Sequence, residues 1–270
     1  MTEREAVLRW DGEWAHPSVH ATGPWDDAAQ HGGVPAALSV AVAEAAAEGW
    51  EGDWSLRRLS LELPKPVPMQ PLRVTQAISG GRSVKRVRVT LHDAAGSEVA
   101  SALLLMQRRA DSGMPAFGQV PAAPPVPSAE ACTTRVRFGG MPDRPAFHTT
   151  GMHIRLADGD SEQPGPATAW FRAERPLVSG RAPSATMLAC AASDFGNGLS
   201  WETPFADTIF VNSDLTVFLE RPPEGDWLGV AARTRVARDG SGMAQSQLFD
   251  HRGHCGEAFQ NLLVFARPKR

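Results

Sequence analysis

The segment GGVPAALSVAVAEAAAEGW, residues 32–50, has the composition of a helix that lies inside a protein. Pro35 stands near its start and Gly49 just past its end, positions that helix boundaries favour for these two residues. Its body is built from alanine, valine and leucine and carries few charges. Helices of this kind are usually enclosed by other elements rather than laid on a surface. The segment therefore predicts a buried helix.

A second segment, APSATMLACAASDFGNG at residues 182–198, repeats this plan. Pro183 stands at its start and Gly196 lies beyond its end, again around a body of small apolar residues. The chain after each helix also repeats itself, because LSLELPKP at residues 59–66 returns as LTVFLERP at residues 215–222. We expect each half of the chain to hold one enclosed helix.

The residues between these markers alternate with the period of two that strands show. In RSVKRVRVTLHD, residues 82–93, valines and leucine face one way while arginines and threonine face the other, as in a half-buried antiparallel strand. Hairpin turns of the form Asp-x-x-Gly follow at DAAG in one half and at DHRG in the other. Two repeats of one helix and an antiparallel sheet predict an α+β fold.

A change of composition separates the two repeats. The stretch ADSGMPAFGQVPAAPPVPSAEACTT, residues 110–134, is rich in proline, alanine and glycine and has neither helical nor strand periodicity. We therefore predict an N-terminal unit over residues 1–110, a linker over residues 111–134 and a C-terminal unit over residues 135–270.

The composition argues against several classes of protein. The chain has 270 residues, is 42% hydrophobic and carries a net charge of −3, so nothing indicates a nucleic-acid partner. Its 3 cysteines are widely spaced and predict neither a disulfide framework nor a zinc site. The N-terminus, MTEREAVLRWDGEW, lacks an apolar signal core, and no run reaches the roughly 18 apolar residues of a membrane span. We expect a soluble, cytoplasmic protein without a metal or a cofactor.

The stretch CAASDFGNGLSW, residues 190–201, places an acid where a helix disfavours it. Asp194 ends the alanine-rich run, so its carboxylate meets the negative end of the helix dipole. One interpretation is that Asp194 closes the helix and begins a turn at the glycines that follow. The other is that the side chain is held there for chemistry.

Four stretches together resemble a known family: HGGVPAAL in the first half, and ASDFGNGLS, FVNSDLTVFLERPPEGDW and GEAFQNLLV in the second. Over roughly residues 10–268, the chain is similar to the double-hotdog (type II) acyl-CoA thioesterases of the thioesterase-like superfamily. The resemblance implies two hotdog units in one chain, each a central helix wrapped by an antiparallel sheet. It also implies a thioester hydrolase of fatty acid metabolism that converts an acyl-CoA to free acid and CoA.

The resemblance implies site residues as well. The type II enzymes hold the attacking water with an Asp, a Ser or Thr, and a Gln from the second hotdog. By position, these fall on Asp194, Asn212 and Gln260. Asn212 replaces the hydroxyl residue of the family, for which Ser213 and Thr216 are the alternatives. Ser213 requires a one-residue shift, which on a strand turns a side chain to the other face.

The internal repeat gives an independent indication. The counterparts of these three residues in the first half are Ala46, Leu56 and Leu103. A polar side chain in a buried place costs about 1–3 kcal/mol unless it is hydrogen-bonded. Polar residues at all three positions in one half and at none in the other favour a site on one side, and thus chemistry at Asp194.

Thioester hydrolysis requires a directed water, a proton acceptor and a stabiliser for the oxyanion. Asp194 is the candidate base, while Gln260 and Asn212, whose amides both donate and accept, orient the water. The backbone N–H groups of Gly32 and Gly33, at the start of the first helix, are candidates for the oxyanion site. In hotdog proteins this helix start faces the acid of the partner hotdog.

Three basic residues near a turn are candidates for binding the phosphates of coenzyme A: Arg82, Lys85 and Arg86. The alternative for this cluster is the exposed face of a strand. A double hotdog is already a pseudo-dimer, and its exposed sheet edges favour further pairing into a homo-oligomer.

Two other functions stay open. The first is non-catalytic binding of an acyl-CoA or an acyl lipid, which Asn212 in place of a hydroxyl residue favours. The second is hydration of an enoyl-CoA, which requires an Asp and a His at close spacing, and the stretch FADTIFVNSDLT has no such His. Release of free thiol from an acyl-CoA distinguishes the hydrolase from both.

Overall fold

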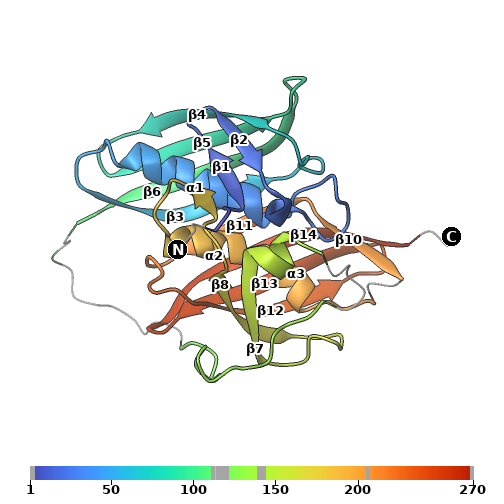
Figure 1. The fold of residues 1–270 in the computed structure, drawn as a ribbon. Helices are drawn as coiled ribbons and strands as arrows, with labels where there is room; N and C mark the ends of the chain where they lie inside the picture. The colour runs from blue at the N-terminus through green and yellow to red at the C-terminus, as the bar shows by residue number, and fades with distance from the viewer. Residues whose placement is uncertain (1–3, 111–112, 114–121, 139–143, 205–206, 268–270) are drawn as a thin grey trace.

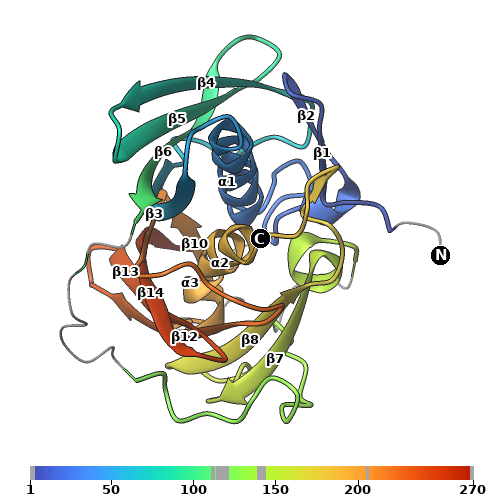
Figure 2. The same ribbon diagram turned by 90° about the vertical axis from the view of Figure 1, so that its left-hand side faces the viewer.

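Both predicted helices are present in the computed structural model, which describes residues 4–110, 113, 122–138, 144–204 and 207–267. Part of the predicted linker therefore lies outside the described residues. Helix α1 spans Gly33–Ala47 and helix α2 spans Ala185–Ser193. The two helices lie side by side in the middle of the molecule, with strands around them (Figure 2). This arrangement confirms the predicted α+β fold with one enclosed helix in each half.

Helix α1 is buried along most of its length, as its composition predicts, and every residue from 33 to 43 is buried. Helix α2 begins after Pro183, where the Ser184 hydroxyl accepts a hydrogen bond of 3.1 Å from the Met187 N–H and caps the helix. Beyond Asp194 the chain continues into a short helix, α3 (Gly196–Leu199), where one interpretation of the sequence placed a turn. In the described residues, no helix is long and apolar enough to cross a bilayer.

The strands follow the helices in both halves. Those of the first half are β1 (Leu8–Trp10), β2 (Trp14–Pro17), β3 (Asp53–Glu62), β4 (Leu72–Gly80), β5 (Val84–His92) and β6 (Glu98–Arg109). Those of the second half are β7 (Met152–Asp158), β8 (Ala167–Ala173), β9 (Val178–Ser179), β10 (Thr208–Asn212), β11 (Asp214–Leu219), β12 (Leu228–Val236), β13 (Ser241–Asp250) and β14 (Gly253–Ala266). Two short helical turns are η1 (Val19–Ala21) and η2 (Phe147–Gly151).

These strands form one sheet in the order β7-β8-β12-β13-β14-β11-β3-β6-β5-β4-β2-β1-β9, with β10 paired to β14. The strands of the first half cover α1, and most strands of the second half cover α2 from the opposite side (Figure 1). The antiparallel pair β3–β11 joins the two halves, and β9 of the second half pairs in parallel with β1 of the first. The halves therefore share one sheet and one helical interior.

The β3–β11 pair has a register that is preserved when the halves are exchanged. The opposed residues are Leu59 with Val217, Ser60 with Thr216, and Leu61 with Leu215. In the sequence repeat, residues 59–61 correspond to residues 215–217. The pairing is therefore self-complementary, as at a two-fold axis between identical subunits, and the pseudo-axis passes between Ser60 and Thr216. Two repeats in one chain assemble as a dimer would.

An equivalent ion pair braces the Asp-x-x-Gly turn of each half. Lys65 Nζ lies 3.2 Å from Asp93 Oδ2, whereas the Arg221 guanidinium donates two hydrogen bonds of 2.6 Å to the two oxygens of Asp250. The Asp250 side chain is 0% exposed against 17% for Asp93. Burial raises the pKa of Asp250, but the bonds from Arg221 and from neighbouring backbone N–H groups outweigh it, and the net pKa is lowered.

Asp250→Asn is expected to lower the free energy of unfolding by about 3 kcal/mol, because it leaves Arg221 without its buried partner. Asp93→Asn, at the equivalent turn, is expected to have a much smaller effect, because solvent screens that pair. The folded pKa of Asp250 lies below its ordinary value of 3.8, so its contribution is present above that pH and is lost as the pH falls through the folded value. Chemical denaturation measures both variants, and equal losses would contradict this assignment.

Candidate active site

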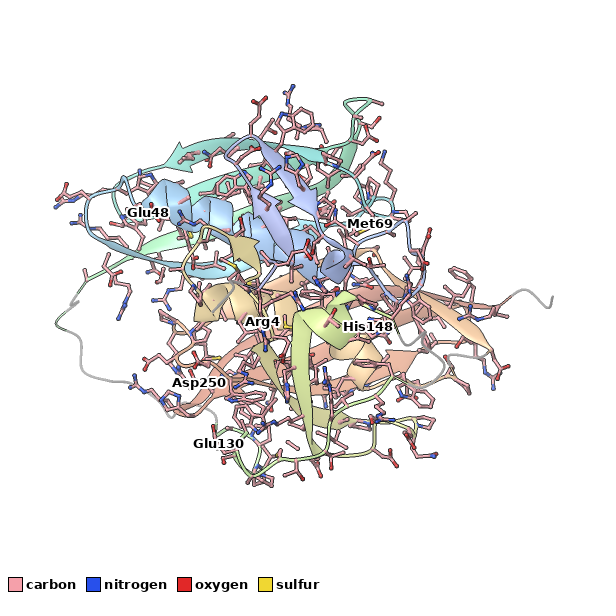
Figure 3. The ribbon with its side chains drawn as sticks, viewed as in Figure 1. Arg4, Glu48, Met69, Glu130, His148 and Asp250 are labelled. Carbon is pink, nitrogen blue, oxygen red and sulfur yellow. The ribbon has the colours of Figure 1, made fainter. Side chains whose placement is uncertain are left out.

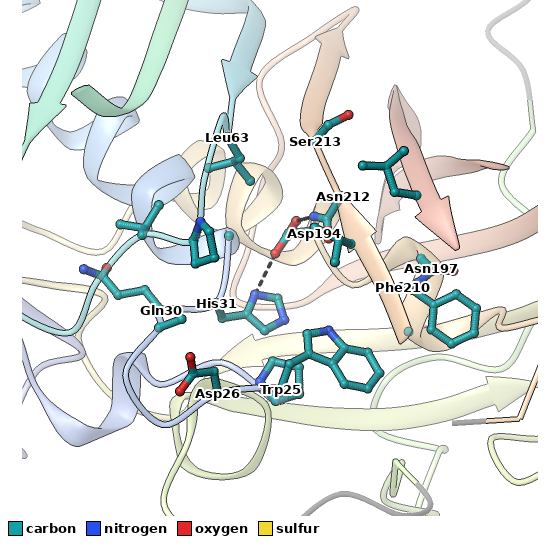
Figure 4. Close-up of a pocket in the computed structure, with 18 of the residues that line it drawn as sticks. Trp25, Asp26, Gln30, His31, Leu63, Asp194, Asn197, Phe210, Asn212 and Ser213 are labelled. Carbon is teal, nitrogen blue, oxygen red and sulfur yellow. Dashed lines mark hydrogen bonds and ion pairs between the residues drawn. The ribbon is translucent and has the colours of Figure 1, made fainter. Parts of the chain in front are cut away.

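A cavity of about 710 Å³ lies where the two halves meet (Figure 4). The start of α1, the junction between α2 and α3, and strand β10 each contribute to its wall. Much of the wall is apolar, with Trp25, Leu63 and Phe210 among its side chains. In the part of the chain that the structure describes, no group of three His, Cys, Asp or Glu side chains is arranged to hold a metal ion.

Asp194 follows the last residue of α2, and its side chain points toward the other half of the chain. This side chain is 3% exposed, and a Cβ placed on Gly32, just before α1, would lie 2.9 Å from Asp194 Oδ2. The carboxylate thus meets the positive end of α1 as well as the negative end of α2. Asp194 closes its helix, but its carboxylate is directed into the cavity rather than into a turn.

Two amide side chains of the second half donate to Asp194. Asn212, at the end of β10, donates through Nδ2 to Oδ1, and Gln260, on β14, donates through Nε2 to the same oxygen at 3.0 Å. Gln260 is 1% exposed. The structure therefore brings together the three residues that the sequence predicts. Ser213 is exposed and Thr216 lies at the pseudo-axis, so the residue in contact with the carboxylate is Asn212.

His31 completes this cluster from the first half, and it was not among the predicted site residues. Its Nδ1 lies 2.7 Å from Asp194 Oδ2, a distance at which the two atoms share one proton. The ring is buried, stacks on Phe195 at a centroid distance of 4.3 Å and lies 5.1 Å from Phe147, so packing fixes its orientation. The available signal was its place in HGGVPAAL, directly before the two glycines.

The two glycines at the start of α1 differ in their surroundings. The Gly33 N–H is directed at His31 Nδ1, at 3.1 Å, rather than into the open cavity. A Cβ on Gly33 would lie 2.5 Å from the Ala191 carbonyl oxygen, which shows how closely α1 and α2 approach here. Among the described residues, the Gly32 N–H has no hydrogen-bond partner. Of the two predicted oxyanion donors, Gly32 is therefore the one with a free N–H.

The basic residues predicted to bind phosphates lie away from this cavity: Arg82, Lys85 and Arg86. Arg82 lies just before β5 and the other two residues lie at its start. The cavity wall includes Lys65, which pairs with Asp93 just past the opposite end of that strand. At about 3.3 Å per residue, the strand between Lys85 and Asp93 spans about 26 Å. Lys85 instead lies over the ring of Trp50, 5.1 Å from its centroid. The predicted place of these residues at the substrate site is therefore not supported.

Comparison with known protein families assigns both halves of the chain. Residues 21–107 match the acyl-CoA thioesterase N-terminal domain, and residues 120–264 match the acyl-CoA thioesterase C-terminal domain. None of the curated proteins matches the chain.

Solved structures share the fold along almost the whole chain. A conserved protein with a hot dog fold from Alicyclobacillus acidocaldarius has a TM-score of 0.69 and 18% identity, covering 97% of this chain and 96% of that one. The tesB protein of Mycobacterium avium subs paratuberculosis has a TM-score of 0.68 and 15% identity, over 97% and 96%. The acyl-CoA thioesterase II TesB2 of Mycobacterium marinum has a TM-score of 0.64 and 14% identity, over 87% and 90%. The predicted architecture of two hotdog units is confirmed.

Gly33→Ala is expected to destabilise the protein by about 1–3 kcal/mol, because the new Cβ meets a backbone oxygen that cannot move without separating the helices. Gly49→Ala is the matched control, since the nearest atom to a Cβ there lies 3.8 Å away. Thermal unfolding of both variants measures the difference. A Gly33→Ala protein as stable as the control would contradict the close approach of α1 and α2.

Proposed function

The chain belongs to the acyl-CoA thioesterase family, and we propose that it hydrolyses an acyl-CoA thioester to free acid and CoA in the cavity between its halves. One observation carries this proposal: an imidazole from the first half and a carboxylate and two amides from the second converge on one buried point. These side chains belong to His31, Asp194, Asn212 and Gln260. Burying several polar side chains together is unfavourable unless they are hydrogen-bonded to one another. Such buried clusters of polar and ionisable groups are typical of functional sites.

The proton shared by His31 and Asp194 is best placed on Nδ1. That nitrogen cannot donate to Oδ2 and accept from the Gly33 N–H at once, and the shorter contact, to the carboxylate, is the stronger. Asn212 and Gln260 both donate to Oδ1, which stabilises the negative carboxylate and leaves the proton on the ring. His31 Nε2 is then unprotonated.

His31, oriented by Asp194, is therefore our candidate for the base. Its Nε2 points away from Asp194 into the cavity (Figure 4). The sequence instead predicts Asp194 as the base, but that carboxylate already receives three donors. A histidine held in one tautomer by a buried carboxylate is an effective proton acceptor near neutral pH.

The reaction follows from this arrangement. Nε2 takes a proton from water as the water oxygen bonds to the thioester carbonyl carbon. The negative oxygen that results faces the Gly32 N–H and the positive end of α1. The C–S bond then breaks, and the CoA sulfur receives the proton from Nε2. Asp194 stabilises the imidazolium that exists between these two steps.

The shape of the cavity supports an acyl-CoA as the substrate. Trp25 and Leu263 at its rim are 39% and 57% exposed, whereas Phe195 at its inner end is 2% exposed. An apolar acyl chain fits the inner end, where it leaves water. The phosphates of CoA remain at the solvent-exposed rim, because burying them without partners is costly.

Hydration of an enoyl-CoA is a second candidate, because His31 supplies from the first half the histidine that FADTIFVNSDLT lacks. A hydratase directs an acid and a base at its substrate separately. Here His31 Nδ1 and Asp194 Oδ2 lie 2.7 Å apart and bind each other, so they are not directed separately at a substrate. This arrangement favours hydrolysis.

Thiol release from acyl-CoAs of increasing chain length tests the proposal. The wild type is expected to release thiol, whereas Asp194→Ala and His31→Gln are expected to lose about 10²–10⁴-fold in kcat, because each removes the proton acceptor or its orientation. His16→Gln, which changes a partly exposed histidine on β2, is the matched control and is expected to retain activity.

Each contrary outcome has a distinct meaning. Full activity in Asp194→Ala would refute the proposed site. Tight binding of acyl-CoA with no thiol release would identify a non-catalytic binding protein. Formation of hydroxyacyl-CoA from enoyl-CoA with no thiol release would identify a hydratase.

A further inference from the structure

One edge of strand β4 is open over most of its length. Only the first two residues of the strand pair with β2, and the Val74 N–H then donates to the Glu13 carbonyl oxygen. Within the described residues, no strand pairs with this side of β4 from Thr75 to Gly80. The strand runs along the margin of the molecule (Figure 1, Figure 2), and side chains extend outward from this margin (Figure 3). The backbone groups that point outward here form a template for another strand.

The second half has an equivalent strand whose edge is protected. Strand β12 corresponds to β4 residue by residue, at the same separation as the rest of the sequence repeat. Strand β8 covers β12 over residues 228–232, and the rest of this edge carries Arg233 and Arg235. The corresponding residues of β4 are Ala77 and Ser79. Charged side chains protect an edge strand against pairing with another strand, so one repeat has this protection and the other lacks it.

The residue between these two positions also differs between the halves. In the second half it is Thr234, which is 3% exposed and whose hydroxyl lies 2.9 Å from that of Ser200, at the end of α3. In the first half it is Ile78, which is 46% exposed although it lies opposite the buried Val87. The first half has no counterpart of α3, because the chain passes from α1 through a turn into β3. An apolar side chain is therefore left exposed beside an open edge.

We propose that β4 pairs with β4 of a second copy of this chain, so that two molecules share one continuous sheet. A two-fold axis perpendicular to the sheet makes the two strands antiparallel. The backbone groups that point outward belong to alternate residues in phase with Val74, namely Gln76, Ile78 and Gly80. Centring the pair on Ile78 places the two Ile78 side chains together, and Gln76 of each copy then lies opposite Gly80 of the other.

The lack of charge in this segment favours an identical partner. A strand that pairs with its own copy is brought against the same sequence, so any charge in it meets a like charge, which is destabilising. Residues 75–81, TQAISGG, carry no charge, and the flanking Arg73 and Arg82 lie outside the segment. A partner of different sequence would require no such neutrality, because opposite charges could face each other.

The mass of the protein in solution, measured by light scattering after gel filtration, tests the proposal. The wild type at micromolar concentration is expected to have twice the mass of one chain. Ala77→Arg combined with Ser79→Arg transfers the protection of β12 to β4 and is expected to have the mass of one chain. Ser101→Arg combined with Gln107→Arg is the matched control, because β6 is paired on both sides, and it is expected to keep the doubled mass.

A cysteine in place of Ile78 locates the contact. The Cα atoms of a hydrogen-bonded antiparallel pair lie about 5.5 Å apart, within the range of a disulfide. Oxidised Ile78→Cys is therefore expected to form a covalent dimer. The native cysteines are buried, so the wild type and the Ser101→Cys control, which changes an internal strand, are expected to remain unlinked.

A wild type with the mass of one chain would overturn the proposal, and so would a doubled mass that persists when both arginines are present on β4. Loss of the doubled mass in the β6 control as well would place the contact on the face of the sheet instead. Thermal unfolding identifies a variant that does not fold, and in that event the cross-link of Ile78→Cys decides. None of these outcomes depends on whether the protein hydrolyses a thioester.

Discussion

The close approach of α1 to the end of α2 is the constraint on which the site depends. Gly33 leaves no room for a side chain against the Ala191 carbonyl oxygen, and the small residues of both helices permit this contact. As a result, a residue just before one helix reaches a residue just after the other. His31 and Asp194 meet for this reason, although they belong to different repeats. Larger residues where the helices touch would hold the His31 imidazole and the Asp194 carboxylate beyond hydrogen-bond distance.

The duplication explains both what the halves share and where they differ. The self-complementary register of β3 and β11 places the halves as two subunits of a dimer, and the ion pairs of Asp93 and Asp250 brace equivalent turns. At the start of α2 the symmetry is broken: the Ser184 hydroxyl donates to Glu44, and Arg181 pairs with Glu48. The counterpart of Asp194 is Ala46. In the first half, therefore, this end of α1 carries no acid at the equivalent position and contacts the start of α2 through the two flanking glutamates.

Sequence patterns predicted the parts of this structure that depend on local chemistry. Alanine-rich composition indicated both buried helices, and the alternation in residues 82–93 indicated β5. The positions of Asp194 and Gln260 followed from the family resemblance, and their apolar counterparts in the repeat supported burial. His31 was not predicted, because a single histidine before two glycines shows no helix or strand periodicity. Its partner, Asp194, also lies in the other half of the chain. Arg82 and its neighbours do not line the cavity, and the sequence did not show this because alternation along a strand does not tell which end lies near a cavity.

The hydrogen bonds around Asp194 fix the geometry of the polar cluster in the cavity. Both carboxylate oxygens of Asp194 have protein partners, so this cluster is preorganised and needs no ligand to hold its geometry. Because protein partners hold the Asp194 carboxylate and the His31 imidazole, the orientation of these two groups does not depend on which substrate enters the cavity.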